Sequence, residues 1–179
     1  MSRTLRLFVA AYPPLPIVEA WLASARSLLP TDVRLSTPEQ VHLTLVFLGD
    51  REERDLPEIR ESIRAATAGI GEAQVEARQL QMLPERGPPR LLAAVTSLPS
   101  SLAELQRRLA RRLALRSSKR DEFLPHFTLA RFPGKSINRR AERLAPEKFV
   151  ISEIRLVRSR LLSAGAEHES DKAFPLQPV

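Results

Sequence analysis

The chain has 179 residues, enough to bury a substantial core, and its 43% hydrophobic and 27% charged residues exclude wholesale disorder. It contains no cysteine, which excludes a disulfide scaffold, a thiolate metal cluster and a cysteine nucleophile. The formal net charge is +7, with the excess in residues 90–179, which carry 18 basic and 9 acidic side chains. This charge favours nucleic acid or a phosphorylated substrate. Because 24 of the 28 basic residues are arginine, an arginine-rich solvated face is the alternative.

The first half of the chain predicts two strands that alternate with two helices. Residues 5–11 form a short apolar strand, and residues 17–29 carry apolar side chains at helical spacing up to a proline. A second strand is predicted over residues 41–47, and an amphipathic helix runs from residue 55 or 56 to residue 68, where glycines end it.

The second half repeats this order and adds strands at its end. Its clearest helix begins at Ser100 or Ser101, where Ser101 and Glu104 form a capping-box pattern and leucines follow on one stripe. Strands are predicted over residues 73–83, 90–97 and 126–132, with a polar loop over 116–122, a long strand region over 149–162 and a short strand over 173–176. Mixed elements with hairpin-sized connections favour an α+β fold over a doubly wound parallel sheet.

No segment predicts a membrane span or a secretion signal. The first apolar run is short and is soon interrupted by Pro13 and Pro14, and no stretch approaches 18 consecutive apolar residues. We therefore expect a soluble, cytoplasmic protein without a membrane partner.

Two similar segments begin 84 residues apart, close to half the chain. His42-Leu43-Thr44-Leu45 and His126-Phe127-Thr128-Leu129 share the order histidine, apolar residue, threonine, leucine, and a glycine follows each within a few residues. This spacing suggests an internal duplication, with two lobes that each contribute one motif. In a strand, side chains at i and i+2 share a face, so each imidazole lies beside a hydroxyl and opposite the apolar residues. A pseudo-twofold axis between the lobes would bring the two polar faces together across a cleft.

The polar residues of these motifs, His42, Thr44, His126 and Thr128, suit a phosphodiester substrate. In-line displacement needs a base for the attacking water and an acid for the departing oxygen, and imidazole can fill either role near neutral pH. Threonine hydroxyls can donate hydrogen bonds to the non-bridging phosphoryl oxygens. The sequence has no cysteine, no His-x₃-His pair and no Asp-rich loop, so we expect neither a metal site nor a cofactor.

The paired His-x-Thr-x motifs resemble those of the two-histidine phosphoesterases, and the whole chain resembles the RNA 2′,3′-cyclic phosphodiesterase family, historically called 2′-5′ RNA ligases. The resemblance extends beyond the motifs nearly end to end. The matching flanks are Leu7–Ala10, Val41–Gly49, Pro89–Leu92, Pro125–Arg131, Arg158-Ser159, Leu161, Gly165 and Phe174–Leu176.

The resemblance implies an α+β fold of two pseudo-twofold lobes, with antiparallel sheets that line a central cleft and helices outside, in a single domain over residues 1–179. It also implies metal-independent opening of RNA 2′,3′-cyclic phosphate ends to 2′-phosphate ends, a step in RNA processing. His42 would then be the proton donor and His126 the acceptor, while Thr44 and Thr128 hold the phosphate. We expect a monomer that needs no protein partner.

Two further residues are open to more than one interpretation. By strand alternation Arg131 lies on the face opposite His126, and we include it as a phosphate contact on the condition that a bulge turns it inward. The family often has an aromatic residue where this chain has Ala93, Val157 and His168. We interpret His168 as a solvated loop residue in a polar run, with partial replacement of a base-stacking ring as the alternative.

Other functions fit the same residues. The alternatives within enzymes are 2′-5′ RNA ligation and hydrolysis of a small cyclic nucleotide. Two alternatives are not enzymes: a non-catalytic RNA-binding module that keeps the cleft, and a structural protein in which the two motifs are hairpins without a function in binding. Loss of turnover without loss of RNA affinity in His42→Ala and His126→Ala would distinguish an enzyme from a binding module.

Overall fold

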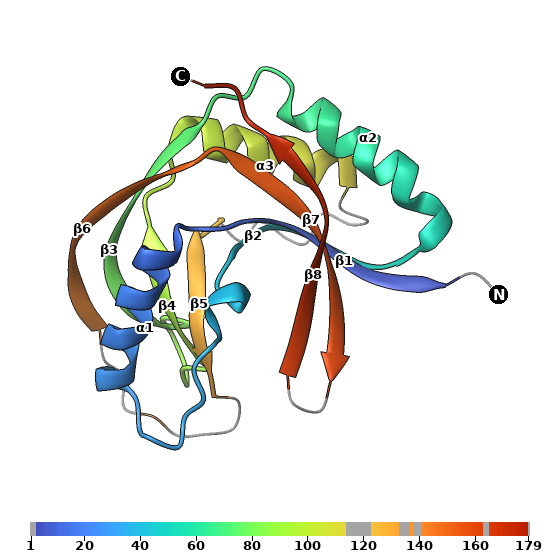
Figure 1. Ribbon diagram of the computed structural model, residues 1–179. Coiled ribbons are helices and arrows are strands. Elements are labelled where there is room, and N and C mark those ends of the chain that lie inside the picture. The colour runs from blue at the N-terminus through green and yellow to red at the C-terminus, as the bar shows by residue number, and fades with distance from the viewer. Residues whose placement is uncertain (1–2, 114–122, 133–136, 138–140, 163–164, 179) are drawn as a thin grey trace.

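The computed structural model describes residues 3–113, 123–132, 137, 141–162 and 165–178, so the polar loop predicted over 116–122 lies outside the described residues. The described chain has the predicted α+β fold (Figure 1). Its strands and helices, in chain order, are β1 (Thr4–Ala11), α1 (Leu15–Leu28), β2 (Leu43–Glu52), α2 (Leu56–Thr67), β3 (Ala73–Leu83), β4 (Leu91–Thr96), α3 (Ser100–Leu113), β5 (His126–Arg131), β6 (Ala141–Ile151), β7 (Glu153–Leu162) and β8 (Gly165–Pro175).

The described strands form one antiparallel sheet of eight, in the order β6-β3-β4-β5-β2-β1-β7-β8. The antiparallel sheets expected on either side of a cleft are the two four-stranded halves of this sheet. The halves join where Leu43 of β2 pairs with Phe127 of β5. These residues hold equivalent positions in the two repeated motifs, so the junction brings the motifs together symmetrically.

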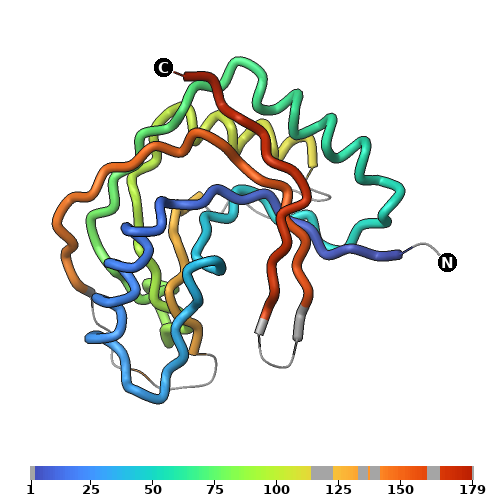
Figure 2. The backbone as a smooth tube through the Cα atoms, in the orientation of Figure 1, coloured from blue at the N-terminus to red at the C-terminus, as the bar shows by residue number. Residues whose placement is uncertain are grey.

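The two halves are interleaved along the chain. The half that contains His126 is continuous, from β3 to β6, whereas the half that contains His42 combines β1 and β2 with β7 and β8. Figure 2 shows the chain leaving β6 at one edge of the sheet and crossing to β7 in the other half. The successions β1-α1-β2 and β4-α3-β5 correspond, which is the order that a duplicated unit produces.

Each helix that leads into a motif strand packs on the opposite half of the sheet. α1 follows β1 but packs against β5, where the Trp21 ring lies 5.3 Å from that of Phe127 between centroids. α3 follows β4 but packs against β2 through a buried leucine stripe. The helices thus tie the two halves together from the side that buries Leu43 and Phe127. No helix in the described ranges is long and apolar enough to cross a bilayer.

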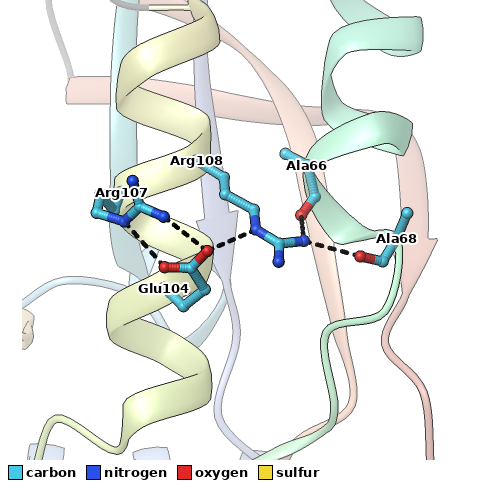
Figure 3. A network of polar contacts seen from close by, with 5 residues as sticks. All are labelled: Ala66, Ala68, Glu104, Arg107 and Arg108. Atoms are coloured by element: carbon cyan, nitrogen blue, oxygen red, sulfur yellow. Dashed lines mark hydrogen bonds and ion pairs between the residues drawn. The ribbon is translucent and has the colours of Figure 1, made fainter.

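A polar network joins α3 to the end of α2 (Figure 3). Glu104 accepts hydrogen bonds from Arg107 and Arg108, and Arg108 Nη1 also donates to the carbonyl oxygens of Ala66 and Ala68, the latter at 2.8 Å. The last carbonyls of a helix have no partner within the helix. Arg108 therefore caps α2 from the neighbouring helix.

Two of the predicted strands have different boundaries in the structure. The region 149–162 is not one strand, because β6 ends and β7 begins on either side of Ser152 and the two strands belong to different halves. The short strand expected over 173–176 is the end of the longer β8. β6 and β8 are the two edge strands of the sheet, and their polar sequences reflect solvent on their free sides.

A buried carboxylate fixes β8 to the rest of the molecule. The Asp171 side chain is 2% exposed and accepts hydrogen bonds from Arg60 of α2 at 2.8 and 2.9 Å, and from Arg158 of β7. Burial raises the pKa of this carboxyl, but the hydrogen bonds from the two guanidinium groups outweigh it and hold the pKa below its usual value.

Candidate active site

The two motif histidines lie at the junction of the half-sheets. His42 immediately precedes β2, and His126 is the first residue of β5. Because the next residue of each motif forms the pair that joins the halves, the two histidines lie on either side of the junction. Both line one cleft of about 570 Å³, together with Thr44 and Thr128. The polar faces predicted from strand alternation thus meet in a common cavity.

Both imidazoles are held by the same local hydrogen bond. The Nδ1 of His42 lies 2.7 Å from the carbonyl oxygen of Gln40, and the Nδ1 of His126 lies 2.9 Å from that of Leu124. In each case the carbonyl belongs to the residue two positions earlier. Since a carbonyl can only accept, Nδ1 carries the proton, and Nε2 is the nitrogen left to exchange a proton with a substrate.

A β-bulge occurs at the same place in both motif strands. Along β4, Leu92 pairs with Ala130 and Ala93 with Thr128, which leaves Leu129 as the extra residue. Along β1, Val9 pairs with Val46 and Ala10 with Thr44, which leaves Leu45 as the extra residue. A bulge shifts the alternation by one position, so the fifth residue after each histidine returns to the polar face.

These bulges place Arg131 and Phe47 in the cleft. Arg131 lines the cavity with the histidines and threonines, which satisfies the condition on which it was included as a phosphate contact. Phe47 occupies the equivalent position in the first motif, is 49% exposed, and lies 4.6 Å from the guanidinium carbon of Arg6. The motif pattern alone does not mark Phe47 as a site residue. The signal was present in the consecutive buried pairs Leu45-Val46 and Leu129-Ala130, which break a strict alternation.

The charge of the cleft is positive. Arg6 and Arg34 line it together with Arg131, and no aspartate or glutamate is among the described residues of its wall. Ser36 and Ser159 add hydroxyl groups beside the two threonines. Cationic groups and hydroxyl donors without a competing carboxylate are the environment that a phosphate group needs. The structure thus adds Arg6 and Arg34 to the residues that the motifs indicated.

The surroundings of the two histidines differ. His42 stacks on Phe8 with ring centroids 4.8 Å apart, the Tyr12 ring lies at 5.8 Å, and the His168 ring lies at 5.0 Å in an edge-on arrangement. Burial lowers the pKa of His42 to about 4, and the charge of Arg131, together with the charge that His168 carries when it is protonated, acts in the same direction. His42 is therefore a neutral imidazole in the free protein near pH 7.

The polar sequence around His168 suggested a solvated loop, but the structure does not place this residue in one. It is part of β8, is half-buried, and lies against both His42 and Phe8. Burial lowers the pKa of His168 as well. All three histidines of the chain therefore line the same cleft.

The part of the chain that the structure describes contains no group of three or more His, Asp or Glu side chains that could hold a metal ion. The functional groups that line the cleft are imidazole, guanidinium, hydroxyl, the carboxamide of Gln40 and aromatic rings.

Comparison with known proteins places this chain in a family. Residues 13–161 match the model of the 2′-5′ RNA ligase superfamily. The chain belongs to this superfamily. A member from Methanothermobacter thermautotrophicus, named RNA 2′,3′-cyclic phosphodiesterase, is 26% identical over 152 residues, which cover 80% of this chain and 83% of the relative.

Solved structures share the fold of this superfamily member over nearly its whole length. The protein TT0787 of Thermus thermophilus superposes with a TM-score of 0.84 at 24% identity, covering 97% of this chain and 99% of that one. Escherichia coli LigT, in a structure with 3′-AMP, superposes with a TM-score of 0.79 at 20% identity and the same coverage. At these identities the likeness shows the fold alone.

Proposed function

We propose that this protein opens 2′,3′-cyclic phosphate ends of RNA to 2′-phosphate ends by acid–base catalysis with His42 and His126. The observation that carries the proposal is the pair of imidazoles, each fixed through Nδ1, on either side of a cationic cleft without a described carboxylate. The name of the archaeal relative and the LigT structure with 3′-AMP support an RNA-derived substrate.

In this reaction water attacks phosphorus and the bond between phosphorus and the 3′ oxygen breaks. One imidazole accepts a proton from the water through Nε2, and the other protonates the departing 3′ oxygen. Thr44 and Thr128 donate hydrogen bonds to the non-bridging oxygens, while Arg131 neutralises the charge that builds on them. The products are a 2′-phosphate and a free 3′ hydroxyl, so atoms and charge balance without a further reactant.

The burial of His42 affects which histidine gives a proton and which takes one. The family resemblance makes His42 the donor and His126 the acceptor. His42 is neutral in the free protein because its pKa is about 4, so it must take up a proton as the substrate binds. A phosphate anion beside an imidazole favours the charged form and raises its pKa. Proton uptake on binding of a cyclic phosphate analogue at pH 6–7 is therefore expected if His42 is the donor.

The test is incubation of a short RNA with a 2′,3′-cyclic phosphate end in excess EDTA, with the position of the product phosphate identified. We expect a 2′-phosphate, and a loss of roughly 10²–10⁴-fold in turnover for His42→Ala and for His126→Ala, since each removes one positioned acid or base. No reaction by the wild-type protein, or strict dependence on an added metal, would overturn the proposal. If the wild type binds RNA without turnover, and both histidine variants keep that affinity, the protein is a binding module.

A second candidate is 2′-5′ ligation, which the family name favours. It opens the same cyclic phosphate and breaks the same bond to the 3′ oxygen, with the 5′ hydroxyl of another RNA in place of water as the attacking group. Adding an RNA with a 5′ hydroxyl end to the same assay measures the ratio of joined to hydrolysed product. A small cyclic nucleotide, tested in parallel, establishes whether the RNA chain is needed at all.

A further inference from the structure

β8 and its neighbours enclose His42 on one side of the cleft. The ring of His168 stands edge-on to the rings of both His42 and Phe8, at interplanar angles of 77° and 71°. A second link passes through Gln40, whose carbonyl oxygen accepts the hydrogen bond from His42 and whose Nε2 donates to the carbonyl oxygen of Ala166 at 2.8 Å. His42 is thus attached to β8 both by ring contact and through its own hydrogen-bond partner.

His126 has no such enclosure. Its Nδ1 hydrogen bond to Leu124 matches that of His42, but among the described residues no aromatic ring lies against it. Phe8 of β1 pairs with Phe47, whereas the equivalent residue of β4, which pairs with Arg131, is Leu91. The enclosure is therefore a property of one motif and is not inherited from the repeated unit.

The hydrogen bonding of His168 indicates an uncharged ring. Its Nδ1 is buried and has no partner among the described residues. A buried N–H without an acceptor is more costly than a buried lone pair, because the donor loses its hydrogen bond to water with nothing in exchange. The proton of neutral His168 therefore lies on Nε2, and the ring offers His42 an uncharged wall.

We propose that His168 is a positioning residue: from β8 its ring holds the His42 imidazole against Phe8 and keeps water from that side, so that Nε2 of His42 is presented to the substrate phosphate in one orientation. The catalytic meaning of this role rests on the proposed function. The contact between the two rings does not.

The groups that face His42 define how its titration responds. They are His168 from β8, Arg131 and His126 from β5, Tyr12 just beyond β1, and the carbonyl of Gln40. The three side chains that can carry positive charge all disfavour protonation of His42, and only the carbonyl favours it. Opening the wall at His168 admits water from that side and so weakens the largest cause of the low pKa, which is burial.

The experiment follows the imidazole signals of the three histidines by NMR as the pH is changed, with each signal assigned by substitution. In His168→Ala the titration midpoint of His42 is expected to rise by one pH unit or more from about 4, whereas in His168→Phe, which keeps a ring, it stays well below 6.5. Glu169→Gln, an exposed change on the same strand, is the control and leaves the midpoint in place. An unchanged midpoint in His168→Ala overturns the proposal.

Steady-state kinetics test the positioning role itself. We expect His168→Ala to lower kcat roughly 10-fold or more with little change in KM, because a misplaced imidazole loses its alignment with the reacting atoms. His168→Phe restores kcat and His168→Asn does not. The reverse result, rescue by asparagine and not by phenylalanine, would show a hydrogen bond to substrate and contradict the proposal. If the wild type does not turn over RNA cyclic phosphates, the proposed function fails. The NMR titration still shows whether the His168 ring encloses His42.

Discussion

At the scale of single residues, His42 and His126 show how one motif gives two different imidazoles. Both have the same Nδ1 hydrogen bond, yet only His42 lies against three other rings. An acid–base pair works through a difference between its members, since one must give a proton while the other takes one. The enclosure supplies such a difference within a symmetric framework.

The low pKa of His42 predicts that the fold loses stability as the pH falls. In the unfolded chain this imidazole takes up a proton near pH 6.5, but in the folded protein only near pH 4, so between these values the unfolded state binds more protons. The free energy of unfolding should fall over this range by up to about 3 kcal/mol. Urea denaturation at several pH values measures this slope. His42→Asn should flatten it, and an equal slope in that variant contradicts the assignment.

Phe47 predicts a contribution to base recognition. A base stacked on an exposed aromatic ring is worth about 1–3 kcal/mol, and here Arg6 lies over the same ring. We expect Phe47→Leu to raise KM for an RNA end roughly 5- to 150-fold, since each 1.4 kcal/mol is tenfold, with a smaller effect on kcat. A cyclic phosphate of glycerol, which has no base, should show no such loss. Val150→Ala, an exposed apolar change on β6, is the control.

At the scale of the elements, the sequence predicts those segments whose own pattern carries the structure. In α3 and in the motif strands, the buried residues are apolar and recur at the spacing of a helix or a strand. Their pattern is therefore visible in the sequence. β6 was missed before residue 149 because Ala141–Lys148 is polar and contains Pro146. Its strand conformation comes from pairing with β3, at an edge where proline is tolerated.

β8 was missed before residue 173 for a related reason. In its first part the side chains that contact other elements include His168, which lines the cleft, and Asp171, which binds Arg60 of α2. Both are polar, so no apolar alternation marks the strand. Their partners, Phe8, Arg60 and Arg158, are distant in the sequence. Local pattern therefore identified the motif residues of the site but could not identify the third histidine beside them.

Asp171 predicts how firmly β8 is held. Asp171→Asn leaves the guanidinium groups of Arg60 and Arg158 without their buried counter-charge. Because these side chains are 35% and 23% exposed, we expect a loss of about 1–3 kcal/mol, below that for a fully buried pair. Because the folded pKa of Asp171 is lowered, its contribution is present above the unfolded value near 3.8 and is lost as the pH falls below it. Urea denaturation at pH 7 measures the difference. Glu169→Gln, at an exposed ion pair, should cost less than about 1 kcal/mol, and equal losses in both variants would refute the buried role.

At the scale of the whole molecule, the crossed packing of α1 and α3 predicts cooperative unfolding. Each half of the sheet is covered by a helix that the other half supplies, so neither half keeps its core alone. We therefore propose that residues 1–179 unfold as one two-lobed unit. Trp21, the only tryptophan of the chain, packs α1 against Phe127 of the opposite half. Its fluorescence and the far-ultraviolet circular dichroism should change with one midpoint in urea, and two separate midpoints would show independent lobes.

The interleaving of the halves also has a consequence for biosynthesis. As the chain leaves the ribosome, β1 and β2 emerge early, but β7 and β8, which complete their half of the sheet, come last. The half from β3 to β6 can pair as soon as residue 151 is available. Until β7 has emerged, β1 has an unpaired edge, the kind of surface that invites association with other chains. The enclosure of His42 by β8 is therefore the final step of assembly, and a nascent chain that stops before β7 carries both motifs without a finished site.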